Sequence, residues 1–474
     1  MASLGHRAEH DSELQKLVHR MNPPRVVVDN ASCETATVLK VDSVNKHGLL
    51  LEVVQILTDL ELIIHKAYFS SDGGWFMDVF HVTDAEGGKL ESKDLIELIQ
   101  KRVLNSFNEH HSDEVGMHSV SESTSIELTG MDRPGLMSEI FTLLTCMQCN
   151  VVAAELWTHN MRVACLVCVT DQFTGGPLKD SDRLSSIKES LCRVLRGVAS
   201  SSTHRARMDF STGITHTERR LHQMMFAGRD YEATNETVTS QSRVSQSALS
   251  SCEETAEEAK ISIENWRERG YSVVSVECQN RTRLLFDTVC TLTDMDYVVF
   301  HATIDSNQNR AYQEYYIRHA DGCTLNSDAE RLRVRHCLKA AIQRRVSKGV
   351  RLELCTNDCI GLLSDVTRIF REHGLSVTRA DVSTKGSIAR NVFYVTDATG
   401  NQVDDKCIEA VRQEIGQAVL RVTPAQSIPL LCKSASGKAR FSLANFLEGA
   451  FNTCSDIWTE LPHVIPWKEI GAAP

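Results

Sequence analysis

The sequence predicts an α+β protein that contains four small domains of one kind, each with the ferredoxin-like βαββαβ topology. Two observations indicate this fold class. A strand, a polar loop, an amphipathic helix, two further strands and a second helix follow one another four times along the 474 residues. In three of these repeats, 36 residues separate a glycine in the loop from an aspartate at the end of the third strand. An internal period of this kind indicates copies of one structural unit.

The loop residue and the aspartate mark the four repeats. These pairs are Gly48 and Asp84, Gly135 and Asp171, Arg283 and Asp321, and Gly361 and Asp397. The third pair is 38 residues apart, so we expect a longer hairpin around Asn307, Gln308 and Asn309. The arginine in place of glycine predicts an altered loop in repeat 3.

Repeat 1 shows how each element is predicted. Thr37 to Val41 alternates like a half-buried strand. From Leu49 to Leu60, leucine and valine recur at helical spacing and give one apolar face. Asp72-Gly73-Gly74 is a turn signal between two strand-like runs. The equivalent turns of repeats 2 and 4 are His159-Asn160 and Lys385-Gly386.

A second helix is predicted in every repeat, at residues 93–104, 181–195, 328–345 and 404–418. A closing strand would complete the topology, and a run that resembles one stands out only at 420–422. The predicted organisation is an N-terminal extension (1–36), repeats at 37–112 and 125–197, a Ser/Thr-rich linker (198–270), repeats at 271–346 and 350–422, and a C-terminal tail (423–474). We expect repeat 1 to pair with 2 and repeat 3 with 4, because a short seam joins each of these pairs. Pairing across the linker is the alternative.

Two segments outside the repeats have a pattern of their own. The hydroxyl-rich run at 237–252 is typical of a mobile linker that could be phosphorylated. Earlier in the linker, Leu221, Met224, Met225 and Phe226 predict a short docked helix. In the tail, 441–451 has the pattern of a weakly amphipathic docking helix.

Composition excludes several classes of protein. The net charge of −11 argues against a nucleic-acid binder, because phosphate affinity comes from Lys and Arg. No run approaches the roughly 20 apolar residues that span a membrane, and we expect neither a secretory signal nor a transit peptide. The 16 cysteines are then expected to be reduced thiols in a cytoplasmic and/or nuclear protein. The sequence leaves the oligomeric state open, a homodimer included.

Two clusters of polar residues have a functional and a structural interpretation. Cys146, Cys149, Cys165 and Cys168 have zinc-like spacing. However, the last two lie three apart on one predicted strand and point to opposite faces, so we expect buried thiols and no metal. Repeat 3 has a basic second helix, with Arg331, Arg333, Arg335, Lys339, Arg344 and Arg345. It could bind an anion, a nucleic acid or an import receptor, but we favour a solvated helix face.

The run ELTGMDRPGLM in repeat 2 resembles the first strand and loop of ACT domains, especially the tandem pair at the C-terminus of the bacterial uridylyltransferase that senses glutamine. Four such domains with a long middle linker resemble the plant ACT-domain-repeat (ACR) proteins. Residues 216–232, HTERRLHQMMFAGRDYE, also resemble the segment between the second and third domains of those proteins. The resemblance implies domains that pair side by side and bind small molecules, typically amino acids, at the domain interface.

The loop chemistry fits such a ligand. A helix N-terminus offers unpaired N–H groups and a positive dipole to a carboxylate. The glycine allows close approach, and a nearby Asp or Asn can hold an ammonium group or cap the helix. The candidate residues are Asn45, Gly48, Leu49, Asp132, Arg133, Gly135, Leu136, Asp358, Gly361 and Leu362. Alternatively, these residues only build turns and caps.

We therefore expect a non-catalytic regulatory protein that binds an amino acid and signals to a protein partner. No Walker A loop, G-x-S-x-G or H-E-x-x-H motif is present, so neither catalysis nor a cofactor is predicted. The upstream catalytic domains of the bacterial enzyme have no counterpart in the residues before repeat 1. The main alternative is a protein-interaction scaffold without a small ligand, and an undetected enzyme is a third hypothesis. An open, well-formed cleft beside Asp132 and Gly135 would favour the sensor, and the same cleft filled by side chains would favour the scaffold.

Overall fold

A computed structural model describes residues 23–46, 48–72, 75–108, 123–197, 206–211, 216–232, 259–266, 268–307, 309–346, 349–417 and 419–424. All of them belong to one compact unit, residues 1–438. The hydroxyl-rich run at 237–252 and the predicted tail helix at 441–451 lie outside the described residues. Among the described helices, none is long and apolar enough to cross a membrane.

Each repeat folds into four strands and two helices. Repeat 1 comprises β1 (Arg25–Asp29), β2 (Thr37–Val44), α2 (Leu49–Asp59), β3 (Ile63–Asp72), β4 (Trp75–Thr83) and α3 (Lys93–Asn108). Repeat 2 comprises β5 (Thr124–Met131), α4 (Leu136–Cys146), β6 (Cys149–His159), β7 (Arg162–Asp171), α5 (Ser181–Arg196) and β8 (Arg207–Ser211). Repeat 3 comprises β9 (Lys260–Trp266), β10 (Tyr271–Gln279), α7 (Leu284–Asp294), β11 (Tyr297–Ser306), β12 (Arg310–His319) and α8 (Asp328–Gln343). Repeat 4 comprises β13 (Val350–Asn357), α9 (Leu362–Glu372), β14 (Leu375–Lys385), β15 (Ile388–Asp397), α10 (Asp405–Ile415) and β16 (Leu420–Pro424).

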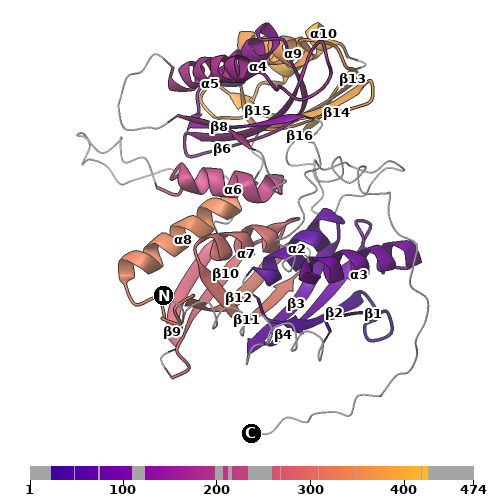
Figure 1. The fold of residues 1–474 in the computed structure, drawn as a ribbon, viewed down its shortest axis with the longest axis vertical. Helices are drawn as coiled ribbons and strands as arrows, with labels where there is room; N and C mark the ends of the chain where they lie inside the picture. The colour runs from indigo at the N-terminus through magenta and orange to yellow at the C-terminus, as the bar shows by residue number, and fades with distance from the viewer. Residues whose placement is uncertain are drawn as a thin grey trace, which may run out of the picture. The chain divides into compact units, whose positions relative to one another are not determined.

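The strands form two antiparallel sheets of eight, which confirms the predicted α+β class. One sheet has the order β1-β2-β4-β3-β11-β12-β10-β9 and the other has the order β16-β13-β15-β14-β6-β7-β5-β8. Figure 1 shows the long helices of each sheet on one of its faces. The strand registers confirm the predicted hairpin turns, with Asp72 opposite Trp75, His159 opposite Arg162 and Lys385 opposite Ile388.

The pairing of repeats differs from the prediction. Repeat 1 pairs with 3 through β3 and β11, where Tyr68 lies opposite Thr303, and repeat 2 pairs with 4 through β6 and β14, where Glu155 lies opposite Asp381. The helices α2 with α7, and α4 with α9, pack across these junctions. The prediction relied on short connections, but lengthening a loop is inexpensive in entropy, at about 0.6 kcal/mol per doubling. Contacts at the strand edges therefore outweigh nearness along the chain.

The closing strands were also only partly predicted. β16 lies where 420–422 was expected to form one, and β8 closes repeat 2 from within the predicted linker. In repeats 1 and 3 the corresponding strands, β1 and β9, precede the first strand and pair with it antiparallel. These two repeats therefore have the order ββαββα. The position beside the first strand can be filled from either end, because an antiparallel neighbour can be reached by a short hairpin.

Each pair of repeats shares one hydrophobic core, and a third cluster lies outside both. Repeats 1 and 3 bury Phe80 and Phe286 in one core, and repeats 2 and 4 bury Phe141 and Phe393 in the other. The third cluster joins α6 (Thr217–Ala227) of the linker to the outer face of β6 and β7. This cluster confirms the predicted docked helix, since Leu221, Met224 and Met225 are buried there. It also explains why β7 is buried along almost its whole length on both faces.

Candidate functional site

The loop between the first strand and first helix has the same backbone conformation in all four repeats. Gly48, Gly135 and Gly361 are left-handed, with φ of 86°, 82° and 84°. Arg283 is also left-handed, with φ of 66°. A residue with a side chain is strained in this region by roughly 1–2 kcal/mol. Backbone geometry alone therefore accounts for Gly48, where an added Cβ would meet no atom within 4 Å.

The Asn or Asp three residues before this position fastens the loop to the hairpin of its own repeat. Three of the four side chains have a partner at the hairpin: Ser71 for Asn45, the Asn307 carbonyl for Asn280, and Thr384 for Asp358. In these three repeats the structural interpretation of the Asn or Asp is sufficient. The fourth residue, Asp132 of repeat 2, is held differently.

Asp132 anchors the hairpin through its backbone and leaves its carboxylate in the loop. Its N–H donates to the Met161 carbonyl at 2.9 Å. The carboxylate accepts a hydrogen bond from the N–H of Arg133, whose guanidinium binds Glu139 and the Val194 carbonyl. Burial raises the pKa of Asp132 to about 6, against the smaller opposing effects of Arg133. A cationic ligand group beside this carboxylate would therefore be stabilising.

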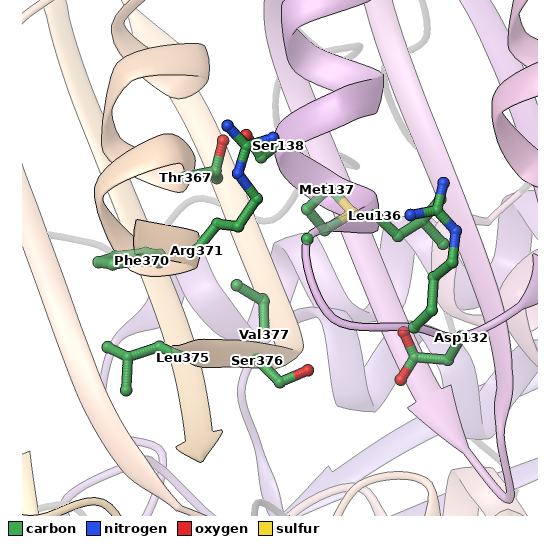
Figure 2. Close-up of a pocket in the computed structure, with 12 residues that line it drawn as sticks. Asp132, Leu136, Met137, Ser138, Thr367, Phe370, Arg371, Leu375, Ser376 and Val377 are labelled. Carbon is green, nitrogen blue, oxygen red and sulfur yellow. The ribbon is translucent and has the colours of Figure 1, made fainter. Parts of the chain in front are cut away.

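Asp132 and Gly135 border a small pocket between repeats 2 and 4, with a volume of about 280 Å³ when the adjoining open solvent is included (Figure 2). Repeat 2 lines it with Asp132, Arg133, Gly135, Leu136, Met137 and Ser138, and repeat 4 lines it with Thr367, Phe370, Arg371, Leu375, Ser376 and Val377. Figure 2 shows the charged groups on two sides, with Asp132 below α4 and Arg371 on α9. The pocket therefore lies beside the predicted loop residues, and it is small and partly filled by the side chains that line it.

The polar groups of this pocket suit a ligand that carries an anionic group close to a cationic one. Arg371 packs against the loop so closely that a Cβ on Gly135 would lie 2.8 Å from its Cδ. Ser138, in the first turn of α4, is 1% exposed, and its Oγ has no hydrogen-bond partner among the described residues. In the related loop of repeat 4, a Cβ on Gly361 would lie 3.6 Å from the Thr145 side chain. The guanidinium thus distinguishes the loop of repeat 2 from that of repeat 4.

The structure separates the predicted site residues into three groups. The pocket brings together Asp132, Arg133, Gly135 and Leu136. The loop of repeat 4 contains Asp358, Gly361 and Leu362, at the same domain interface but outside the pocket lining. The loop of repeat 1 contains Asn45, Gly48 and Leu49, in the other sheet. Leu49 and Leu136 are buried core residues, so they support their loops from beneath.

Sequence reasoning missed the half of the pocket that repeat 4 supplies. Thr367, Arg371 and Ser376 belong to α9 and β14, and only the pairing of repeats 2 and 4 brings them to Asp132. Ser138 of repeat 2 was missed as well, although a hydroxyl within the first turn of an otherwise apolar helix face could have signalled it.

The loop of repeat 3 keeps the left-handed backbone of the others but carries Arg283 in place of glycine, and a side chain of α6 contacts it. Arg283 forms an ion pair with Glu218 of α6, which also pairs with Arg345 at the end of the basic helix. Arg344 is buried as well and binds Asp230 through two hydrogen bonds of 2.6 Å. The prediction of a solvated helix face is therefore wrong for these last two arginines. Their charged groups are tolerated in the interior because each one pairs with a buried carboxylate.

The four cysteines with zinc-like spacing differ in their surroundings. Cys149, Cys165 and Cys168 are buried as expected, but Cys146 is exposed, so the expectation of a buried thiol is wrong for that residue. Cys165 lies in the core of repeats 2 and 4, where burial raises its thiol pKa, whereas Cys168 lies 3.6 Å from the Ser125 hydroxyl. Within the described part of the chain, no three His, Cys, Asp or Glu side chains are grouped so that they could hold a metal ion.

Four ferredoxin-like repeats that pair through edge strands, each with a left-handed residue before its first helix, have the architecture of a protein built from ACT domains. Comparison with known proteins agrees. A family model described as the ACT domain matches residues 350–416, and one described as the ACR family N-terminal ACT domain matches residues 32–110.

Similar proteins cover most of the chain. ACT domain-containing protein ACR4 of Arabidopsis thaliana is 53% identical over 87% of this chain and 89% of its own length. ACT domain-containing protein ACR3 of the same plant is 54% identical over 86% and 89%. The chain belongs to the ACR family of ACT domain-containing proteins. The bifunctional uridylyltransferase/uridylyl-removing enzyme of Azospirillum brasilense is 34% identical over 21% of this chain and only 11% of the enzyme.

Proposed function

We propose that this chain is a non-catalytic regulatory protein that binds a free amino acid between repeats 2 and 4. The observation that supports this most is the pocket with the half-buried carboxyl of Asp132 at one side and the guanidinium of Arg371 at the other. Asp132 would take the α-ammonium group. Arg371 and the N-terminus of α4 would take the α-carboxylate.

The side chain of the amino acid would meet hydroxyl groups. Ser138, Thr367 and Ser376 line the same pocket, and the unsatisfied Oγ of Ser138 gains a partner when a polar ligand enters. Because α9 and β14 belong to repeat 4, a ligand there contacts both repeats. Occupancy would change the stability of the pair, and a protein partner in the cytoplasm or nucleus would recognise that change.

The test is binding of the common amino acids to the purified full-length chain. A ligand that binds only the folded state increases the free energy of unfolding by mass action, by about 2.7 kcal/mol at a concentration one hundred times Kd, and so raises the melting temperature. We expect one amino acid, or one chemical class, to shift the wild type. Arg371→Met and Asp132→Asn should abolish the shift. Arg368→Met is the matched control, because Arg368 is exposed on the same helix and pairs with Glu372.

The alternative is a scaffold that uses ACT domains only for protein association. One observation favours it, since the loop of repeat 3 already contacts the chain's own Glu218. Absence of a shift with every amino acid, confirmed by titration calorimetry, would overturn the sensor and leave the scaffold. A shift that survives in both pocket variants would place the ligand elsewhere.

A further inference from the structure

The helix α6 has two sides with opposite chemistry. Its apolar side chains Leu221, Met224 and Met225 pack on Trp157 and Leu166 at the outer face of repeat 2. The opposite side contacts α7, the helix that follows the altered loop of repeat 3. The linker thus delivers polar side chains to the loop of repeat 3 while it is anchored on repeat 2.

Glu218, in the first turn of α6, meets that loop directly. One carboxylate oxygen pairs with Arg283, and the other pairs with Arg345 of the segment after α8. Glu218 is 5% exposed and Arg345 is 4% exposed, so both groups of that pair are withdrawn from water. Arg283 holds its left-handed backbone at the position where three other repeats have glycine, immediately before the N-terminus of α7. An arginine-lined helix N-terminus of this kind is a carboxylate site.

The neighbouring acidic residue has partners of its own. Asp287 lies 2.7 Å from Arg281, 2.8 Å from Arg345 and 2.8 Å from His222. Burial lowers the pKa of His222 to about 4, so its ring is neutral at pH 7 and adds no positive charge. Asp287 therefore balances Arg281 and shares Arg345, and Glu218 balances Arg283.

We propose that the loop of repeat 3 is a carboxylate-binding site whose resident ligand is Glu218 of the chain itself. Repeat 3 thereby recognises the linker helix in place of a free molecule. The class of ligand follows from the contacts, because two guanidinium groups each take one oxygen of a single carboxylate. This proposal is independent of any ligand between repeats 2 and 4, since it involves a different loop in the other sheet.

The test removes the carboxylate and returns it as a free ion. Glu218→Ala deletes the two carbons and two oxygens of an acetate ion, so acetate is the probe. We expect the variant to melt several degrees below the wild type in sodium chloride. Tens of millimolar sodium acetate, at constant ionic strength, should restore part of that loss. Acetamide, which has the same shape without the charge, should restore none, and the wild type should not respond to acetate.

The matched control is Glu232→Ala, because Glu232 is half exposed and pairs with Arg229 just beyond α6. It should change the melting temperature little and should show no acetate response. An equal acetate effect on both variants, or none on Glu218→Ala, would overturn the proposal.

If Glu218→Ala does not fold, Glu218→Gln preserves the volume and permits a double-mutant cycle with Arg283→Gln. Side chains that form a buried pair should be coupled by roughly tenfold or more in the unfolding equilibrium constant. Coupling below about twofold would mean that Arg283 and Glu218 are merely neighbours, and the proposal would fail.

Discussion

Asp230 allows the strongest quantitative test of how the linker is held. It is fully buried, and its carboxylate accepts two hydrogen bonds of 2.6 Å from Arg344 and lies 3.0 Å from His159. Its carbonyl accepts another hydrogen bond from Asn160 at 2.6 Å. Asp230→Ala would leave the Arg344 charge buried without its main partner. Breaking one side of a buried pair costs about 3–5 kcal/mol, a large fraction of a typical unfolding free energy of roughly 5–15 kcal/mol.

Urea denaturation followed by far-UV circular dichroism measures this loss. The control is Asp209→Ala, since Asp209 forms an exposed pair with Lys188 and such pairs contribute about 0–1 kcal/mol. A loss for Asp230→Ala no greater than that of the control would refute the claim that the buried pair holds the linker to repeat 3.

The same pair predicts a pH dependence with a definite sign. Burial alone would raise the pKa of Asp230, but the charge and hydrogen bonds of Arg344, with help from His159, hold it below its usual range. The stabilisation is therefore complete above the unfolded-state pKa of about 4 and is lost as the pH falls through the folded-state value. Asp230→Ala should show a shallower loss of stability on the acid side than the wild type.

Two further variants test local features of the fold. Asp78 is fully buried in the core of repeats 1 and 3, with no side-chain partner for its carboxyl oxygens among the described residues, and burial raises its pKa well above normal. Wild-type stability should then fall as the pH rises above about 4, whereas Asp78→Leu should remove that slope and gain about 1–3 kcal/mol at pH 7, measured by urea denaturation at several pH values. Gly349→Ala should cost more than about 2 kcal/mol by the same assay, because φ is 91° and the new Cβ would lie 2.0 Å from the Val395 carbonyl oxygen.

The sequence was sufficient for the strand–helix–strand–strand–helix part of each repeat because its signals are local, but it did not show where the fourth strand comes from. The period from Gly135 to Asp171 spans a helix and a hairpin, and their apolar spacing and turn residues can be recognised in the sequence alone. The left-handed loop position was readable for the same reason, since glycine is the residue that adopts it without strain. Four of the twelve residues that line the candidate site followed from this one loop.

The other half of the site depends on contacts between segments far apart in the chain. Arg371 meets Gly135 only because β6 pairs with β14, and no local pattern encodes the choice of partner among four similar edge strands. The burial of Arg344 was equally hidden, because an arginine on a helix usually remains in water. One neglected signal existed in β7. Ala164 and Leu166 are apolar at outward positions, which predicts a covering segment on that face.

The hairpin between β6 and β7 connects the pocket to the linker by bonds that can be followed one by one. On one side, Met161 accepts the N–H of Asp132, at the border of the pocket. On the other side, His159 and Asn160 hold Asp230, which binds Arg344 of repeat 3. A ligand can act through this route only if it favours one arrangement of the hairpin over another by its own binding energy. Demonstrating such coupling requires a ligand affinity that changes when Asp230 is replaced, and the ligand must then change the stability of the Asp230 contact by the same factor.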